Sequence, residues 1–235
     1  MLELRQLTVR RGGMTVLHGI DMDIAPGGIT ALLGANGAGK SSLVLAVAGA
    51  LAVASGWIAI DGAALQNFRP EQVRAAGVAV VPQGHRVLSE LSVRDNLRVA
   101  AAYQPKAQAA QAVERAVAVF PELQAQWHTL GSALSGGQQQ MVCIAQALVA
   151  APRYLLLDEL SLGLAPVVVK RLAEVVRQTA AQGVGVLLIE QFTSLALELA
   201  SQACVLERGR MVFSGSAELL RTQPDILHSS YLAAA

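Results

Sequence analysis

Glycines, a lysine and serines lie together early in the chain, in a spacing suited to phosphate binding. The segment Gly34-Ala35-Asn36-Gly37-Ala38-Gly39-Lys40-Ser41 matches the Gly-x-x-x-x-Gly-Lys-Ser pattern of a Walker A loop. Glycines let backbone N–H groups approach a phosphate closely, and a helix N-terminus adds positive partial charge. We expect Lys40 to reach the β- and γ-oxygens of ATP and Ser41 to ligate Mg²⁺. The next residue, Ser42, belongs to the same predicted ATP site.

A second chemical feature is a pair of carboxylates at the end of an apolar run. Residues 154–157 predict a buried strand, and Asp158 and Glu159 follow it directly. Asp158 would organise the Mg²⁺ shell, and Glu159 would orient or deprotonate the attacking water. The alternative is an ordinary acidic pair at a strand end. Gln83 follows another apolar run, where its amide could contact both Mg²⁺ and the water; otherwise it is a plain loop glutamine.

A third feature is the segment Leu134-Ser135-Gly136-Gly137-Gln138, which opens a predicted helix that continues to about Ala150. Ser135 and the amides of the two glycines would form an anion site at the helix N-terminus. The chain already has one phosphate loop, so this site would bind the γ-phosphate of ATP held by another subunit. A head-to-tail pair would then sandwich each ATP. The alternative is a simple N-cap serine.

The elements that must position these residues alternate between strands and helices. Alternation over residues 2–9 and 16–24 predicts two strands with a turn at Gly12-Gly13. A strand and tight turn are expected over 57–62, and buried strands over 29–33, 78–81, 154–157 and 184–189. Helices are expected over 40–49, 166–181, 194–200 and 217–221, and a hairpin over 203–213. Residues 86–150 are mainly helical in pattern, with breaks at Pro105, Pro121 and Gly131. We therefore expect one domain over 1–235, with an α/β core (about 1–85 and 151–235) and an inserted helical lobe (about 86–150).

Composition excludes several classes of protein. The 235 residues are 53% hydrophobic and carry a net charge of +1, so no strong field points to nucleic acid. The longest apolar run, 43–54, is too short to span a bilayer, which takes roughly 20 residues. The N-terminus lacks the apolar core of a signal peptide. Cys143 and Cys204 are expected to be buried, reduced thiols in a soluble, cytoplasmic protein.

These motifs, in this order, are similar to those of the ATP-binding subunits of ABC transporters, and the resemblance covers essentially the full chain. The segment Leu134–Gln138 is specific to that superfamily, whereas the Walker A loop alone is not. The resemblance implies a P-loop NTPase (RecA-like) α/β core, an N-terminal antiparallel β subdomain and an inserted α-helical lobe. It also implies ATP and Mg²⁺ as ligands and transport-coupled ATP hydrolysis.

Finer features resemble the shorter ATPase subunit of branched-chain amino acid importers. Residues 161–166 replace the Asp-bearing loop of most ABC proteins, and Gln191 stands at the position of a switch histidine. Residues 81–86 and 230–232 complete the pattern. The resemblance implies uptake of branched-chain or other hydrophobic amino acids, transmembrane permease partners and, indirectly, a solute-binding protein. It also implies a second ATPase subunit, different or identical, and a peripheral place on the cytoplasmic face of the inner membrane.

The sequence departs from the family pattern at a few positions. Arg11 stands where an aromatic residue usually stacks on adenine, and Val16 belongs to the same predicted ATP site. Leu160 replaces a usual proline and Gln146 a usual arginine. Gln191 can hydrogen-bond a γ-phosphate but cannot titrate as histidine does. Rival interpretations are urea or amide uptake, lipid export, a soluble ABC clamp acting on DNA or ribosomes, and a small-molecule kinase.

Overall fold

The N-terminal part of the chain forms an antiparallel sheet. The computed structural model describes residues 1–235 except 66–67, 85, 192, 224 and 226–235. β1 (Leu2–Arg11), β2 (Met14–Ile24), β4 (Val53–Ile60) and β5 (Ala63–Ala64) form a four-stranded sheet in the order β2-β1-β4-β5. Alternate side chains of β1 are buried, as its sequence alternation predicts.

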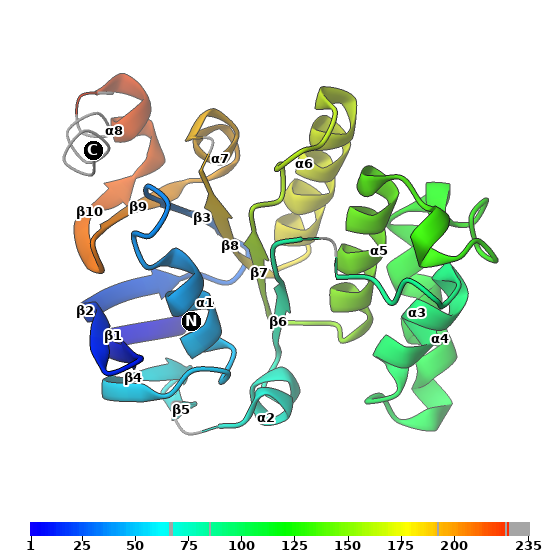
Figure 1. Cartoon of the computed structure of the whole chain (residues 1–235), viewed down its shortest axis with the longest axis horizontal. Coiled ribbons are helices and arrows are strands. Elements are labelled where there is room, and N and C mark those ends of the chain that lie inside the picture. The colour runs from blue at the N-terminus through cyan, green and yellow to red at the C-terminus, as the bar shows by residue number, and fades with distance from the viewer. Residues whose placement is uncertain (66–67, 85, 192, 224, 226–235) are drawn as a thin grey trace.

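A second, mainly parallel sheet forms the centre of the molecule (Figure 1). Its order is β10-β9-β3-β8-β7-β6, with only the β9–β10 pair antiparallel. The strands are β3 (Ile29–Leu33), β6 (Val78–Val81), β7 (Tyr154–Asp158), β8 (Gly185–Glu190), β9 (Gln202–Glu207) and β10 (Arg210–Ser216). Strands β3, β7 and β8 are buried along their whole length, as expected for a parallel sheet covered on both faces.

Helix α1 (Lys40–Val47) lies between the two sheets and contacts strands of both. Its residues share one apolar cluster with Leu4, Leu7, Leu32 and Leu156. On the other face of the parallel sheet pack α6 (Pro166–Ala181), α7 (Thr193–Leu199) and α8 (Ala217–Thr222), within a second cluster. The carboxyl ends of β3, β7 and β8 therefore converge beside the start of α1, where a parallel α/β sheet presents its ligand site.

Three helices stand beside the sheets, at the right of Figure 1, and we call them the helical lobe: α3 (Val93–Ala101), α4 (Lys106–Ala118) and α5 (Gly136–Val149). Short 3₁₀ turns at Pro121–Leu123 and Gly131–Ala133 lead into α5. The breaks expected near Pro105, Pro121 and Gly131 coincide with the ends of these elements. Helix α5 packs against β6, which joins the helical lobe to the core.

Most elements match the sequence prediction within a few residues, and the fold class is the expected one. Two short elements were missed, β5 and α2 (Pro70–Ala75). Cys143 and Cys204 are both buried and unpaired, and burial raises the pKa of Cys143 to about 12. Within the described residues, no helix has the length and apolar character needed to cross a membrane.

Candidate nucleotide-binding and hydrolysis site

The loop between β3 and α1 has the backbone geometry of a phosphate loop. Gly34, Gly37 and Gly39 have φ angles of 151°, 80° and 111°, which favour glycine. A Cβ on Gly34 would lie 2.3 Å from the carbonyl oxygen of Leu206, so no larger residue fits there. The helix begins immediately afterwards at Lys40, so the loop wraps over a helix N-terminus.

Lys40 lies under this loop with only 6% of its surface exposed. Its Nζ donates hydrogen bonds to the carbonyl oxygens of Gly34 (2.6 Å) and Ala35 (3.1 Å). Burial lowers the pKa of Lys40, while the charges of nearby carboxylates, Glu159 first, oppose that shift. Hydrogen bonds to the loop carbonyls and attraction to these carboxylates therefore hold the Lys40 ammonium against the loop.

Ser41 and Asp158 meet at the base of the loop. Ser41 is in the first turn of α1, and the Asp158 carboxylate, which is 7% exposed, ends β7. Burial raises the pKa of Asp158, and the neighbouring Glu159 adds to the effect, whereas the Lys40 ammonium and the nearby Ser41 hydroxyl oppose it. The Ser41 hydroxyl and the Asp158 carboxylate thus lie close to the Lys40 ammonium. Hydroxyl and carboxylate oxygens are ligands that suit a hard cation such as Mg²⁺.

Glu159 has a left-handed backbone, with φ of 54°. This conformation is uncommon for a residue other than glycine. A hydrogen bond from its N–H to the carbonyl of Ile189 on β8 (2.8 Å) stabilises it. Its carboxylate accepts a hydrogen bond from the Gln83 side-chain amide, so the expected base contacts the segment that joins β6 to the helical lobe.

A pocket of about 840 Å³ opens over these residues. The predicted site residues that line it are Arg11, Val16, Asn36, Gly37, Gly39, Lys40, Ser41, Ser42, Gln83, Glu159 and Gln191. The pocket lining does not include Gly34, Ala35, Ala38 or Asp158. The carbonyls of Gly34 and Ala35 accept hydrogen bonds from Lys40, and Asp158 lies beside Ser41.

Sequence reasoning missed four lining residues, Thr15, Leu162, Arg208 and Gly209. Gly209 donates a hydrogen bond to the carbonyl of Ala38 (2.8 Å), which fastens the β9–β10 turn to the phosphate loop. A Cβ on Gly209 would lie 2.3 Å from the carbonyl oxygen of Val16. The Arg208-Gly209 pair predicts only the turn of a hairpin, because nothing in the neighbouring sequence shows that this turn contacts the phosphate loop.

The segment Leu134–Gln138 lies outside this pocket. Ser135 is the N-cap of α5: its Oγ accepts from the Gln138 N–H (3.3 Å), and its own N–H donates to the Gln138 side chain (2.9 Å). A Cβ on Gly137 would lie 2.9 Å from a methyl group of Val168 on α6. Gly137 is thus required for packing, whereas Ser135 and Gly136 are exposed.

The residues that depart from the family pattern have defined places in the structure. Gln146 donates a hydrogen bond to the Asn96 side chain (3.1 Å), which links α5 to α3. Leu160 is 1% exposed and belongs to the core beneath the parallel sheet. Arg11 is exposed at the pocket rim. Positions 85 and 230–232, part of the expected family pattern, lie outside the described residues.

The fold and the phosphate loop define an ATPase of the P-loop class. The family model described as ABC transporter matches residues 17–161. The chain belongs to the ABC transporter family, as one of its ATP-binding, ATP-hydrolysing subunits.

Individual relatives agree with this assignment. The chain is 37% identical, over 96% of its length and 97% of the relative, to the high-affinity branched-chain amino acid transport ATP-binding protein BraG of Pseudomonas aeruginosa. It is 33% identical, over 94% of each chain, to the probable branched-chain amino acid transport ATP-binding protein LivF of Archaeoglobus fulgidus. A solved ATP-binding subunit of an ABC transporter superposes with a TM-score of 0.85 at 27% identity, covering 99% of this chain and 98% of that one.

Proposed function

We propose that this chain is the ATPase subunit of an importer for branched-chain or other hydrophobic amino acids. The observation that carries the proposal is end-to-end similarity: 37% identity to a branched-chain amino acid transport ATP-binding protein over 96% of one chain and 97% of the other. The residues 161–166 and Gln191, which depart from most ABC proteins, support the same subgroup. The whole chain acts as one nucleotide-binding domain with its helical lobe at about 86–150.

The site residues have separate roles in ATP hydrolysis. Backbone N–H groups of residues 34–39 and the ammonium of Lys40 bind the phosphates. Glu159 accepts a proton from, or orients, the attacking water, and Gln191 hydrogen-bonds the γ-phosphate. Gln83 contacts Glu159 and so connects the nucleotide to the lobe. Arg11, Val16 and Ser42 complete the pocket, with the Arg11 guanidinium stacked on the adenine face.

The donor set fits Mg²⁺. Ser41, Asp158 and Gln83 offer hydroxyl, carboxylate and amide oxygens, the ligand types that this ion prefers, and the first two lie side by side. When bound, Mg²⁺ neutralises charge on the β- and γ-phosphates. Asp158 then orients Ser41 and the ion's shell.

A second subunit, identical or similar, completes each site. Ser135, Gly136, Gly137 and Gln138 lie outside the chain's own pocket, and Ser135 and Gly136 are exposed on a helix N-terminus. In a head-to-tail dimer these groups would contact the γ-phosphate of the partner's ATP. ATP binding would then close the dimer, and hydrolysis would open it.

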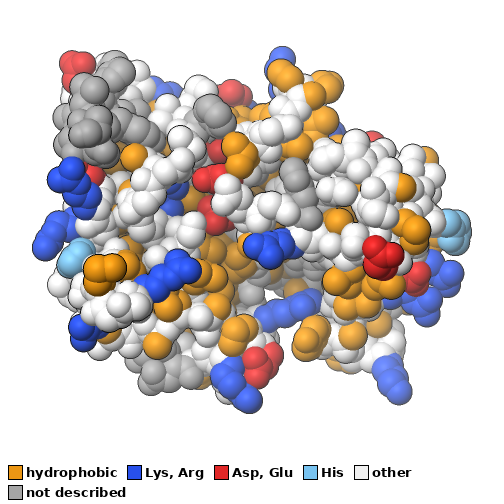
Figure 2. Space-filling model, viewed as in Figure 1, with side chains coloured by type: hydrophobic (Ala, Val, Ile, Leu, Met, Phe, Trp, Pro, Cys, Tyr) orange, Lys and Arg blue, Asp and Glu red, His pale blue; other side chains and the backbone are white. Residues whose placement is uncertain are grey.

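The permease would dock in a groove between the core and the helical lobe. This groove, of about 410 Å³, is bounded by α2, β6, α3 and α5, and Figure 2 shows a hollow there with hydrophobic side chains on both sides. Leu88, Val99 and Tyr103 expose 44%, 47% and 71% of their surface at its edge. Exposed apolar groups beside a groove favour a protein partner. The chain would therefore sit peripherally on the cytoplasmic face of the inner membrane, with a solute-binding protein acting through the permease.

The test is co-purification followed by transport. The tagged full chain should copurify with membrane subunits and a second ATPase from detergent-solubilised membranes. Leu88→Asp should lose the membrane subunits, whereas Leu219→Asp, a similarly exposed leucine on the distant α8, should keep them. Vesicles that hold the complex and enclose ATP should accumulate leucine when leucine and the solute-binding protein are added outside. Uptake of urea instead, or a chain bound to ribosomes or DNA without a permease, would overturn the proposal.

A further inference from the structure

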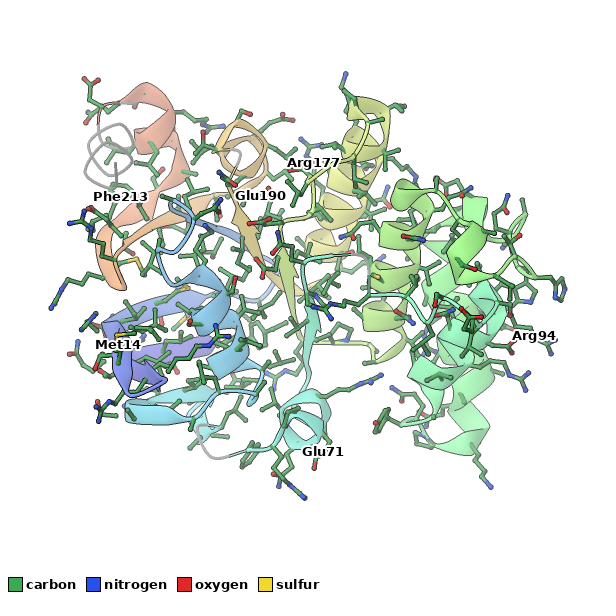
Figure 3. The ribbon with its side chains drawn as sticks, in the orientation of Figure 1. Met14, Glu71, Arg94, Arg177, Glu190 and Phe213 are labelled. Atoms are coloured by element: carbon green, nitrogen blue, oxygen red, sulfur yellow. The ribbon has the colours of Figure 1, made fainter. Side chains whose placement is uncertain are left out.

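Glu190 is a buried carboxylate to which the mechanism above gives no role. It ends β8, next to Gln191, and is 1% exposed; Figure 3 shows it at the end of the strand, away from the outer surface. Its two carboxylate oxygens accept hydrogen bonds from Ser161, one from the backbone N–H (3.1 Å) and one from the hydroxyl (2.9 Å).

These bonds connect two segments that line the nucleotide pocket. Ser161 begins the loop that follows the base, and the next residue, Leu162, lines the pocket. On the other side, Gln191 follows Glu190 and lines the same pocket. The carbonyl of Ile189 also accepts the N–H of Glu159. The end of β8 is therefore hydrogen-bonded to the turn on both sides of Leu160, at Glu159 and at Ser161.

Stability alone does not account for a carboxylate at this place. Burying a charge is costly, and an apolar side chain of similar size would avoid that cost. The charged groups that act on Glu190 or respond to it are the Asp158 and Glu159 carboxylates, which repel it, and the Lys40 ammonium, which attracts it. Residues 161–166 contain no carboxylate of their own, so Glu190 supplies the acceptor that the loop lacks.

We propose that Glu190 is a positioning residue for ATP hydrolysis: it holds Ser161 so that Glu159, Leu162 and Gln191 keep a fixed arrangement around the γ-phosphate. Glu190 does not touch the nucleotide. Its effect is on the geometry of the turn that carries the base and on the loop that would face the partner subunit. The inference rests on the proposed roles of Glu159 and Gln191.

The test compares steady-state hydrolysis and ATP binding by full-length variants. Glu190→Gln keeps the shape of the side chain but replaces one charged acceptor with an NH₂ donor, so the Ser161 hydroxyl must turn from donor to acceptor and the charge-assisted contact is weakened. We expect kcat to fall roughly 10- to 100-fold, the scale of a small misplacement of catalytic groups, with nucleotide affinity unchanged. Ser161→Ala, which keeps the backbone bond, should lower kcat less. The double variant should lose little more than Glu190→Gln alone, because both changes remove one contact.

Thr179→Val serves as the matched control, because it removes a buried hydroxyl that donates to the carbonyl of Val175 (2.7 Å) in α6, away from the pocket. It should leave kcat unchanged. Wild-type kcat in Glu190→Gln, additive losses in the double variant, or a parallel fall in ATP affinity would each overturn the inference. If Glu190→Gln does not fold, the Ser161→Ala variant alone tests the inference. A wild-type kcat in Ser161→Ala would then contradict it. Loss of turnover in Glu159→Gln beside normal Glu190→Gln would sink this inference but leave the proposed site standing.

Discussion

Ser41, in the first turn of α1, lies beside the carboxylate of Asp158, at the end of β7, close enough to oppose the rise in the pKa of that carboxylate. The two residues come from distant parts of the sequence, and the parallel sheet brings them together because the carboxyl ends of β3 and β7 lie at the same edge. Two oxygen ligands suited to a cation therefore lie side by side at this edge of the sheet.

Asp158→Asn should therefore weaken use of Mg²⁺. We expect the Mg²⁺ concentration for half-maximal ATP hydrolysis to rise roughly 10- to 100-fold, the usual scale for disturbing a metal's orienting shell. Asp23→Asn, at a carboxylate that pairs with Arg5 away from the pocket, is the control and should not change it. An unaltered Mg²⁺ titration in Asp158→Asn would remove this residue from the metal shell.

Sequence patterns predicted the parts of this molecule that depend on local physics. The Walker A spacing needs glycines at fixed backbone angles, and the alternation of residues 2–9 follows from one buried face, so both were readable directly. Gly137 shows the limit: its packing against Val168 depends on how α5 meets α6, which no local pattern reveals. The Glu190–Ser161 contact and the place of Arg208 in the pocket likewise arise only when distant segments meet.

The close approach of Gly137 to α6 predicts a cost for any side chain there. Gly137→Ala would place a Cβ 2.9 and 3.0 Å from the two methyl groups of Val168, which is β-branched and cannot turn away easily. We expect the free energy of unfolding to fall by about 1–3 kcal/mol, the usual cost of overpacking. Val168→Ala in the same chain should restore much of it in denaturant titrations. Destabilisation that persists in the double variant would contradict this packing role.

Tyr154 is a buried residue at which a substitution should not destabilise the protein. Its hydroxyl is buried and has no hydrogen-bond partner within the described residues. Removing a buried, unpaired polar group relieves a desolvation cost, so Tyr154→Phe should leave the free energy of unfolding unchanged or raise it by about 1 kcal/mol. Thr179→Val, which loses a made hydrogen bond, should lower it by about 1 kcal/mol. A clear loss of stability in Tyr154→Phe would show that its hydroxyl has a partner.

Glu190 predicts a pH dependence of stability. Burial raises the pKa of Glu190 from 4.5 to about 7, with the hydrogen bonds from Ser161 opposing the shift. The folded state therefore binds this proton more tightly than the unfolded state, so the contribution of Glu190 to stability is fully present below about pH 4.5 and is lost as the pH rises through about 7.

The measurement compares the wild-type chain with Glu190→Gln in denaturant titrations at several pH values. The wild-type chain should lose up to about 3 kcal/mol relative to Glu190→Gln between about pH 5 and about pH 8. Asp158, whose pKa is also raised, is present in both chains, so the difference between them reports Glu190 together with its repulsion by Asp158 and Glu159. A difference that stays constant with pH would contradict a buried, titrating Glu190.

The most direct test of the account is steady-state ATP hydrolysis by Glu159→Gln, measured beside ATP binding by the same protein. Gln keeps the hydrogen-bonding shape but cannot accept a proton from the water. We predict wild-type ATP affinity with turnover reduced roughly 10²- to 10⁴-fold, the contribution of a general base. Near-normal hydrolysis by Glu159→Gln would contradict the assignment of Glu159 and, with it, the proposed mechanism.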